Sequence, residues 1–432
     1  MTPQARILSV IEILESFLDT KQPADGILNN YLKTRRYIGS KDRRFINDFF
    51  WKIIRNLAKI CFASDLNPEK TFKSDARLIV ITALKALENY SIEDITAVFS
   101  GLKYAPEALK NEELQFLEKP LNFDNFPENI ALEMPLWLYE KLQKVFGSSY
   151  YDEMKALLDE ANPVLRINTI KTSVDDYIAQ LDKAEISYQK SQNAPLGIIL
   201  DKRINTGEIP GFNDGLAEFQ DEASQLIALL CQPQKQAKVL DFCAGAGGKS
   251  LALAAIMKND GEIEATDISR SKLNNIYLRQ KRAGAKIINP ISFEKYEDLP
   301  DWFKNYFDVV LVDSPCSGTG TFRRTPDAKW RIEEKRIETL NNLQMEILEE
   351  VLPMLKTGGR LVYATCSMLA DENENIINEF LRRHKNLKLV NANQILYQAT
   401  QNNLFNKENY FLNMTPFKNK TDGFFGAVME KL

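Results

Sequence analysis

The sequence predicts an α/β fold with a Rossmann-like, mostly parallel sheet in its C-terminal half. From about residue 210 onward, short apolar runs alternate with longer amphipathic runs. Runs such as KVLDF and FDVVLVD are apolar almost throughout, which is typical of strands buried on both faces. Strands that alternate with helices in this way form parallel sheets covered by helices on both sides. A glycine-rich turn directly after the first strand, CAGAGGK at 243–249, supports the same prediction.

Residues 1–128 predict a separate, all-helical domain. Almost no strand signal occurs there, and apolar residues recur at helical spacing in DRRFINDFFWKIIRNLAKICF and DARLIVITALKALENY. The first residues, MTPQARILSVIEILESFLDT, show the same spacing and lack the apolar stretch of a signal peptide. We therefore expect helices from the first residues onward.

Residues 129–209 predict a linker and a small α+β subdomain. Pro, Asn and Asp in NFDNFPENIALEMPLWL are typical of a linker. The short β-branched runs VLRINTI and LGIIL then predict strands. The third predicted domain spans residues 210–432.

Within residues 210–432, each predicted strand is followed by a predicted helix. KVLDF precedes SLALAAIM, GEIEATD precedes SRSKLNNIYLRQKRAG, FDVVLVD precedes EEKRIETLNNLQMEILEEVLPML, and GGRLVYAT precedes DENENIINEFLRRH. Ligands in such sheets bind beyond the carboxyl ends of the strands. This rule places the glycine turn, Asp267, DSPCSG and TCS along one edge of the predicted sheet.

The composition is that of an ordinary soluble protein, with 44% hydrophobic and 26% charged residues among 432. The five cysteines are scattered without a CxxC pair, which argues against disulfides and a zinc site and favours a reducing compartment. No apolar run approaches the roughly 20 residues that a membrane span requires. We expect a cytoplasmic monomer with no membrane association and no bound metal.

The net charge of −4 does not by itself indicate nucleic-acid binding, but two local basic clusters do. The stretch KTRRYIGSKDRR at 33–44 contains several Lys and Arg residues and only one acidic residue, Asp42. FRRTPDAKWRIEEKR at 322–336 interleaves Phe322 and Trp330 with Arg and Lys, a combination suited to phosphates and stacked bases. The alternative is that these clusters are solvated surface.

The stretch VLDFCAGAGGKS at 239–250 ends on Gly248-Lys249-Ser250, as a Walker A phosphate loop does. That loop requires its first glycine at position 243, where this chain has Cys243. VVLVD at 309–313 nevertheless has the form of a strand that delivers an acid to Mg²⁺. A P-loop-like NTPase therefore stays open as an alternative.

A glycine turn without the phosphate-loop spacing fits a ligand that has a nucleoside and no phosphate chain. Gly245, Gly247 and Gly248 allow the backbone to approach a ligand closely. Asp267 ends the next strand, where a carboxylate can accept ribose hydroxyls. We therefore predict S-adenosylmethionine as the cofactor. The alternative is a tight turn followed by a helix-capping aspartate.

Two cysteines follow apolar strands at the same predicted edge. Cys316 lies in DSPCSGTG and Cys366 in ATCSM, both among Ser, Thr and Gly. Free cysteines are usually buried structural residues, which is our expectation for Cys61 and Cys231. Two thiols in polar loops that face one cleft instead predict nucleophilic chemistry.

Five segments together resemble the Sun/Fmu (RsmB-like) family of RNA (cytosine-5) methyltransferases. They are FQDEASQL, CAGAGGKS, DSPCSGTGTFRRTPDAKWR, YATCSMLADENENI and TPFKNKTDGFFGAVM. The likeness extends from about residue 130 to the C-terminus. The helical N-terminal third resembles the NusB-like RNA-binding domain of members that act on 16S ribosomal RNA. The resemblance implies an S-adenosylmethionine-dependent enzyme acting on 16S rRNA, with tRNA as an alternative substrate and a non-enzymatic RNA-binding assembly factor as an alternative function.

The resemblance also implies roles for individual residues. Cys366 is the implied nucleophile and Cys316 the implied aid to product release, roles that spacing alone leaves open. A thiolate that adds to carbon 6 of cytosine makes carbon 5 able to accept a methyl group. Asp313 is implied at the amino edge of the cytosine and beside the cofactor, and Lys249 as a cation near the base. The implied cofactor-binding residues are Cys243, Ala244, Gly245, Ala246, Gly247, Gly248, Lys249, Asp267 and Asp313.

Three features depart from the family pattern. Gly245-Ala246 replaces the usual Ala-Pro of the turn, which predicts a less rigid loop on the same path. No aspartate is evident after the third strand, where Ser292, Glu294 and Glu297 are the polar residues. The histidine that often precedes DGFF is absent.

Overall fold

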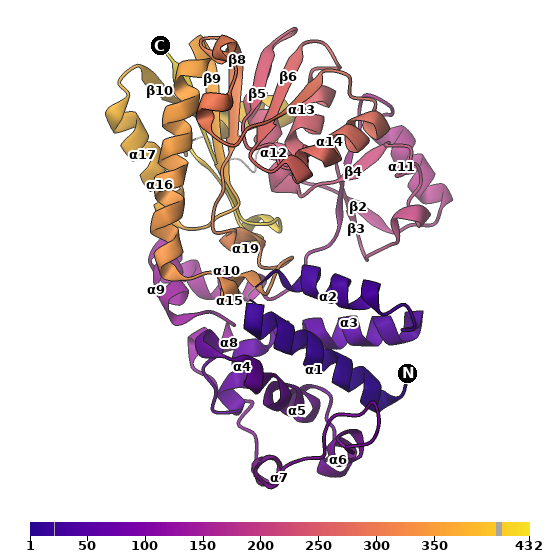
Figure 1. Cartoon of the computed structure of the whole chain (residues 1–432). Helices are drawn as coiled ribbons and strands as arrows, with labels where there is room; N and C mark the ends of the chain where they lie inside the picture. Colours follow the sequence, from indigo (N-terminus) through magenta and orange to yellow (C-terminus); the bar gives the residue numbers. More distant parts are fainter. Residues whose placement is uncertain (21, 403–407) are drawn as a thin grey trace. The chain divides into compact units, whose positions relative to one another are not determined.

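The computed structural model of the chain describes residues 1–20, 22–402 and 408–432. The chain divides into two compact units. Residues 1–158 and 324–334 form the first, here called the helical unit, and residues 159–323 and 335–432 form the second, the sheet unit (Figure 1). These bounds differ from the predicted 1–128, 129–209 and 210–432, which stay predictions of domain organisation. None of the helices described is long and apolar enough to cross a membrane.

The helical unit consists of amphipathic helices that bury their apolar faces in one core. In the first helix, Ile7, Val10 and Leu14 are buried, as their spacing predicts. Ser91 and Asp94 form a capping box that starts the sixth helix. The described part of the unit contains no strand. Its helices are α1 (Pro3–Thr20), α2 (Ala24–Thr34), α3 (Ser40–Arg55), α4 (Leu57–Ala63), α5 (Ala76–Leu87), α6 (Ile92–Val98), α7 (Asn111–Glu118), α8 (Glu128–Ala131), α9 (Leu136–Phe146), α10 (Tyr150–Ala156) and α15 (Ala328–Arg331).

The segment 324–334 is an excursion of the chain that packs within the helical unit. The Oδ2 atom of Asp327 accepts the backbone N–H of Ala24 at the start of α2 (3.1 Å) and the Nε–H of Arg331 (2.7 Å). Trp330 packs against the apolar core of the unit. Lys329 is only 2% exposed. The excursion is therefore anchored by buried polar and apolar contacts.

Burial corrects the predicted RNA contact for two side chains of the 322–336 cluster, Phe322 and Lys329, whereas Lys335 and Arg336 are exposed and their contact with RNA stays a prediction. Phe322 is fully buried and Lys329 nearly so, which removes both side chains from solvent. Glu133, also fully buried, provides the negative charge that compensates Lys329. A run of basic and aromatic residues looks the same in the sequence whether it binds RNA at the surface or anchors a segment inside the protein. Only the burial of the side chains distinguishes the two cases.

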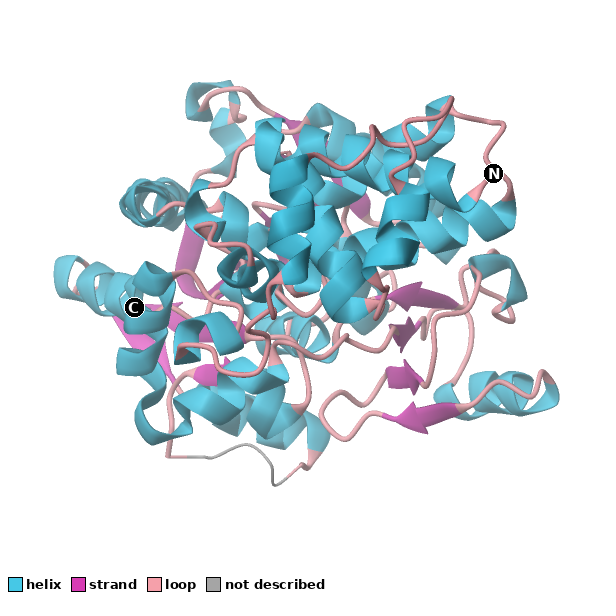
Figure 2. Ribbon diagram, turned by 90° about the horizontal axis from the view of Figure 1, so that it is seen from below, coloured by secondary structure: helices cyan, strands magenta, loops and turns pink. Residues whose placement is uncertain are grey.

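The sheet unit contains a small antiparallel sheet with strand order β2-β3-β1-β4. Figure 2 shows its four short strands side by side. One face is covered by α11, which buries Tyr177 and Leu181 against Leu165 and Ile198. Its elements are β1 (Val164–Ile167), α11 (Val174–Lys183), β2 (Tyr188–Lys190), β3 (Gly197–Leu200) and β4 (Ala217–Phe219).

The second sheet of the unit is mostly parallel, which confirms the predicted α/β fold. Its strand order is β10-β12-β9-β8-β5-β6-β7, with β11 paired to β12. The strands from β9 to β7 are parallel, whereas β12 runs antiparallel to β9, β10 and β11. The strands are β5 (Lys238–Asp241), β6 (Glu262–Asp267), β7 (Ile288–Ser292), β8 (Phe307–Asp313), β9 (Leu355–Thr365), β10 (Leu387–Val390), β11 (Leu412–Met414) and β12 (Phe424–Lys431).

Helices cover both faces of this sheet (Figure 1). Alternate residues of β8 point to opposite faces: Val309 and Leu311 pack in one core, and Val310 and Val312 pack in the other. The first core is completed by α12 (Glu222–Cys231), α13 (Gly248–Ile256), α14 (Arg270–Ala283) and α18 (Ala392–Thr400), and the second by α16 (Glu334–Val351) and α17 (Glu374–Arg383). A short helix, α19 (Pro416–Asn419), precedes β12.

Candidate active site

Two backbone hydrogen bonds join the glycine turn after β5 to the end of β6. The backbone N–H of Gly245 donates to Asp267 Oδ2 (2.9 Å), and that of Ala244 donates to the carbonyl of Thr266 (2.9 Å). A Cβ atom at Gly247 would lie 2.8 Å from Ile276 of α14, so a side chain there would separate the turn from that helix. The same Cβ at Gly245 would meet nothing within 4 Å. Glycine at 247 therefore serves packing, and the backbone at 245 faces open space.

Asp267 ends β6 and fastens two backbone segments. Besides Gly245, it accepts the N–H of Ser269 through Oδ1 (2.7 Å). In the adjacent strand β7, Ser292 is the residue paired with Asp267. The register thus identifies Ser292, rather than Glu294 or Glu297, as the residue at the carboxyl end of the third strand.

Cys243 opens the glycine turn, and its thiol is not a candidate nucleophile. Burial raises the pKa of the Cys243 thiol well above its ordinary value, and the charges of Asp313 and Asp267 act in the same direction. A thiol held protonated in this way reacts poorly, because the thiolate is the reactive form. The side chain packs against the core under α16 and α17.

Asp241, at the end of β5, was not among the predicted site residues. Its side chain is fully buried, and Oδ2 accepts the hydroxyl hydrogen of Ser250 (2.6 Å). Burial raises the pKa of Asp241 to about 6, although the Ser250 hydrogen bond and the Lys249 charge act in the opposite direction. Among the described residues, its Oδ1 atom is buried without a hydrogen-bond partner. Its position directly before the glycine turn was the available sequence signal.

Cys316 and Cys366 come together at the carboxyl ends of β8 and β9. Their Sγ atoms lie 3.4 Å apart, within hydrogen-bonding distance for sulfur. The hydrogen bond with Cys366 raises the pKa of the Cys316 thiol well above its ordinary value, and burial and the Glu372 charge add to this effect. Cys316 is therefore held as a protonated thiol next to Cys366. Cys61 and Cys231, by contrast, are buried away from this edge in the apolar cores.

Lys249 and Asp313 form an ion pair at the same edge. Lys249 Nζ lies 2.5 Å from Asp313 Oδ2, and the Lys249 side chain is only 9% exposed. Burial alone would lower the pKa of Lys249, but Asp313, Asp241 and Cys366 outweigh it and raise that pKa. Lys249 therefore remains a cation in the vicinity of Cys366. A lysine that contacts an acid at this distance can orient the acid and neutralise charge that forms near it.

Two consecutive residues hold the loops that carry the cysteines. Glu372 accepts the backbone N–H of Ser317 (2.8 Å) and the Ser317 hydroxyl. Asn373 accepts the Thr365 hydroxyl through Oδ1 (2.5 Å) and donates from Nδ2 to the carbonyl of Ser367 (2.9 Å). Glu372 thus fixes the loop of Cys316, and Asn373 fixes the residues on both sides of Cys366. The sequence does not single out Glu372 among the neighbouring acids. Glu372 differs from them by being fully buried, which only the fold determines.

The loop before β12 contacts the two cysteine loops through Gly320 and Gly423. The N–H of Gly320 donates to the carbonyl of Cys366 (2.9 Å), and the N–H of Gly423 donates to the carbonyl of Gly320 (2.8 Å). A Cβ atom at Gly320 would lie 2.1 Å from the Gly423 carbonyl oxygen. The DGFF segment, Asp422–Phe425, therefore contributes close backbone packing and the start of β12.

The predicted site residues thus gather along one rim of the sheet, at the carboxyl ends of β5, β6, β8 and β9. In the described part of the chain, no group of three or more His, Cys, Asp or Glu side chains is placed to hold a metal ion. The glycine turn, the carboxylate after β6 and the parallel sheet define a Rossmann-like, S-adenosylmethionine-dependent methyltransferase.

The chain belongs to the Sun/Fmu (RsmB/F) family of RNA methyltransferases. The family's sequence profile matches residues 228–430, and the profile of the RsmF/B-like ferredoxin-like domain matches residues 134–206. The resemblance read from the sequence, the methyltransferase class and the S-adenosylmethionine cofactor are confirmed by these matches.

One relative and two solved structures illustrate the likeness. Ribosomal RNA small subunit methyltransferase B of Escherichia coli (strain K12) is 33% identical over 298 residues, which are 69% of this chain and 66% of that protein. The crystal structure of PH0851 covers 100% of this chain and 99% of its own, with a TM-score of 0.80 and 24% identity, and supports the fold alone. A methyltransferase homolog protein from Pyrococcus horikoshii covers 71% of this chain and 98% of its own, with a TM-score of 0.58 and 26% identity. The match thus spans slightly less than two thirds of the E. coli relative.

Proposed function

We propose that the chain methylates carbon 5 of a cytosine in 16S ribosomal RNA, with Cys366 as the nucleophile. The observation that carries this proposal is the pair of thiols 3.4 Å apart at the rim that also carries the glycine turn. A single cysteine near a cofactor turn would be unremarkable, because free cysteines are often structural. Two converging thiols beside a lysine cation fit a reaction in which one thiol adds to the base and must later leave.

The glycine turn, Asp267 and Asp313 are the residues that would hold S-adenosylmethionine, which supplies the methyl group. The backbone at Gly245 faces open space, so a ligand can approach the turn there. Asp267, already oriented by two backbone N–H groups, presents its carboxylate at the end of β6, where ribose hydroxyls bind in related folds. The buried Oδ1 of Asp241 adds a further acceptor behind the turn.

In the first step, the Cys366 thiolate forms a bond to carbon 6 of an extruded cytosine. The base must leave its stack, because a thiol cannot reach carbon 6 inside a helix. The electron pair of the 5,6 double bond shifts toward carbon 5. Carbon 5 thereby becomes the nucleophile that forms the bond to the methyl group. Lys249, which is held as a cation by its ion pair with Asp313, is the group expected to stabilise this charge, and Asp313 orients it.

In the release step, the proton on carbon 5 is lost to a base, the 5,6 double bond re-forms, and the bond from carbon 6 to Cys366 breaks. Cys366 leaves as a thiolate. The protonated Cys316 donates its hydrogen bond to that sulfur and so stabilises the leaving group. The resemblance to the family assigns Cys366 as nucleophile and Cys316 to release, and the raised pKa of the Cys316 thiol beside Cys366 is consistent with that assignment.

The helical unit supports an RNA substrate. Of the basic stretch at 33–44, Lys33, Arg36, Lys41 and Arg44 are exposed and free to meet phosphates. Arg43 instead donates to the carbonyls of Ile38 and Arg35, which fixes the turn between α2 and α3. We assign this unit a NusB-like RNA-binding role and expect the enzyme to act as a monomer without a metal.

The test is methyl transfer and trapping with RNA containing 5-fluorocytidine. Fluorine at carbon 5 cannot leave as a proton, so the adduct with the nucleophile persists. We expect a covalent complex with 16S rRNA that requires S-adenosylmethionine and disappears in C366A. A complex that survives in C366A and disappears in C316A would reverse the assignment. Methylation of tRNA and not of 16S rRNA would overturn the substrate and leave the chemistry standing.

A further inference from the structure

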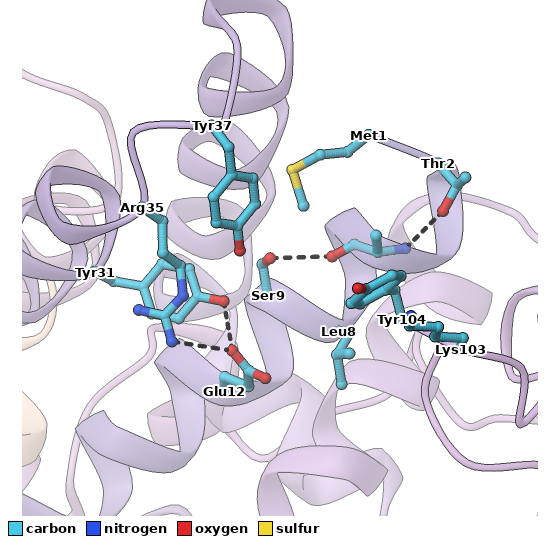
Figure 3. Close-up of a pocket in the computed structure, with 11 residues that line it drawn as sticks. Met1, Thr2, Leu8, Ser9, Glu12, Tyr31, Arg35, Tyr37, Lys103 and Tyr104 are labelled. Carbon is cyan, nitrogen blue, oxygen red and sulfur yellow. Dashed lines mark hydrogen bonds and ion pairs between the residues drawn. The ribbon is translucent and has the colours of Figure 1, made fainter.

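The helical unit contains an aromatic and cationic pocket far along the chain from the residues of the reaction. Its volume is about 660 Å³, which lies in the range of small-molecule and nucleotide sites. Residues from the ends of α1 and α2 and from the loop after α6 line it. In Figure 3, Tyr31 and Tyr37 approach from one side and Tyr104 with Lys103 from the other.

Two of the tyrosines in this pocket are unusually exposed. Tyr37 is 73% and Tyr104 is 68% exposed, although aromatic side chains are generally kept from water. Tyr104 also has a φ of +65°, a backbone conformation that a bulky residue rarely adopts. Hydrogen bonds from Gly101 N–H to Pro106 and from Ala105 N–H to Leu102 hold its loop in this form. Strain of this kind persists where a side chain is presented to a ligand.

Charged groups stand next to the aromatic rings. The Arg35 guanidinium lies 3.6 Å from the Tyr31 ring centroid, and Lys103 Nζ lies 5.0 Å from that of Tyr104. Lys33, in the last turn of α2, and Arg36, in the turn that follows, are both exposed. Aromatic faces flanked by cations are the elements with which proteins bind single-stranded nucleic acid, because bases stack and phosphates are neutralised.

Glu12 gives the pocket one acceptor. Its carboxylate accepts the Tyr31 hydroxyl and lies 3.6 Å from Arg35. Burial and this hydrogen bond raise the pKa of Tyr31, so the hydroxyl stays a donor that orients the carboxylate. Glu12 is 42% exposed, so it can also accept a hydrogen bond from a ligand. A carboxylate repels phosphate and accepts from the amino groups of cytosine, adenine and guanine, which uracil lacks.

We propose that this pocket binds one unpaired, amino-bearing nucleotide of the RNA, with its base stacked on Tyr37 and Tyr104 and its phosphate facing Arg35 and Lys103. The site rests on the proposal that RNA is the substrate, and it extends that proposal by a second contact that is separate from the target cytosine. It explains why these tyrosines are exposed and why an acid lies among cations.

The test uses the full chain and a single-stranded oligocytidine RNA of about eight nucleotides with one 5-iodocytidine. Irradiation joins the iodinated base to an aromatic ring stacked on it, and mass spectrometry locates the joined peptide. We expect the crosslink on the peptide of Tyr37 or Tyr104. A crosslink confined to other peptides would overturn the inference.

Binding variants provide the second measurement, by fluorescence anisotropy of labelled oligomers. Y37L and Y104L should each weaken binding of oligocytidine about tenfold, a typical loss for one stacked base, while Y37F should bind as the parent does. F72L is the matched control, because Phe72 belongs to the same unit, is 69% exposed and does not line the pocket. Equal affinities of Y37L, Y104L and F72L for oligocytidine would overturn the proposed nucleotide site. The pocket would then have to serve another kind of ligand, such as a peptide.

The acceptor is tested by base preference. Oligocytidine and oligoadenosine should bind the parent chain more tightly than oligouridine, and E12Q should reduce that difference because an amide can also donate to uracil. Methyl transfer is assayed in parallel. Intact methyl transfer without the crosslink would overturn this inference alone, whereas the crosslink without methyl transfer by the parent chain would overturn the proposed function alone.

Discussion

The Sγ atoms of Cys316 and Cys366 lie 3.4 Å apart, although 50 residues separate the two cysteines in the chain. Adjacent parallel strands, β8 and β9, bring them together, because the carboxyl ends of parallel strands meet at one edge of the sheet. The hydrogen bond between the thiols distinguishes them chemically. The contact with Cys366 and burial raise the pKa of the Cys316 thiol well above its ordinary value, so Cys316 is held protonated.

The first prediction concerns the separate roles of the thiols. C366A should lose methyl transfer by at least about a thousandfold, since the covalent route is removed. C316A should instead accumulate a covalent complex with unmodified RNA, because the leaving thiolate lacks its donor. Denaturing gels after incubation with RNA and S-adenosylmethionine measure this complex. The double variant should show none, and a complex in the double variant would mean that a third nucleophile acts.

The second prediction is a reversible disulfide between the same cysteines. Bond formation requires the sulfurs to approach to about 2.0 Å, a shift of little more than an ångström. Mild oxidation with diamide should abolish methyl transfer and lower the number of thiols that can be alkylated after unfolding from five to three. Dithiothreitol should restore both. C316S should keep its remaining four thiols under the same treatment; their loss would indicate pairing with another cysteine.

The third prediction separates Glu372 from Asn373. E372Q disturbs the loop of Cys316 and should slow turnover about tenfold or more while the covalent RNA complex accumulates, as in C316A. N373A disturbs the loop of Cys366 and should reduce formation of that complex. The two variants therefore shift the amount of the complex in opposite directions.

The control for this pair is E374Q, which changes an acid two residues from Glu372 that accepts a hydrogen bond from Asn413, outside the cysteine loops. S-adenosylmethionine affinity, measured by calorimetry, should be equal in all three variants. A parallel loss of the complex in E372Q and N373A would show general loosening of the site rather than separate positioning.

The fourth prediction is a pH dependence of stability caused by Asp241. Its pKa is about 6 in the folded chain and about 4 when unfolded, so the folded state binds the extra proton between these values. The free energy of unfolding therefore falls as pH rises from about 4 to 6, by up to about 3 kcal/mol, and stays lower above pH 6. D241N has no carboxyl group to ionise, so its free energy of unfolding should not show this decrease.

Urea unfolding followed by circular dichroism checks this prediction. D241N should be more stable than the parent chain at pH 8, and the difference should shrink as the pH is lowered toward 4.5. S250A, which removes the hydrogen bond to the carboxylate, should be less stable than the parent at pH 8. A gain in D241N that is constant with pH would exclude the titration of Asp241 as its cause.

The fifth prediction concerns the buried charges that anchor residues 324–334. Glu133 accepts the N–H groups of Ala58 and Lys59 at the start of α4 (2.8 and 3.1 Å) and compensates Lys329. K329M removes the compensating cation and should destabilise the helical unit by about 3 kcal/mol. The double variant with E133Q should lose less than the sum of the two single variants, because the charges are removed together. Additive losses would show that the two side chains act independently.

Much of the sheet unit could be predicted because its information is local. The alternation of apolar strands with amphipathic helices depends on nearby residues, as does the glycine turn that follows β5. The motif residues Lys249, Asp313, Cys316 and Cys366 could be placed at one edge because strand direction determines where each strand ends. The reversed direction of β12 was not predicted, since a strand's sequence does not state which neighbour it pairs with.

The sequence by itself determined the family, the α/β class and the chemical types gathered at the rim. Tertiary structure decided which side chains are buried: that Glu372 holds the Cys316 loop, that Asp241 lies behind the glycine turn, and that Lys329 is an anchor rather than an RNA contact. Burial, and with it the pKa of an acid or thiol, depends on residues distant in the chain. A pattern read along the sequence can supply the groups, but their protonation and accessibility follow only from the neighbours that the fold brings to them.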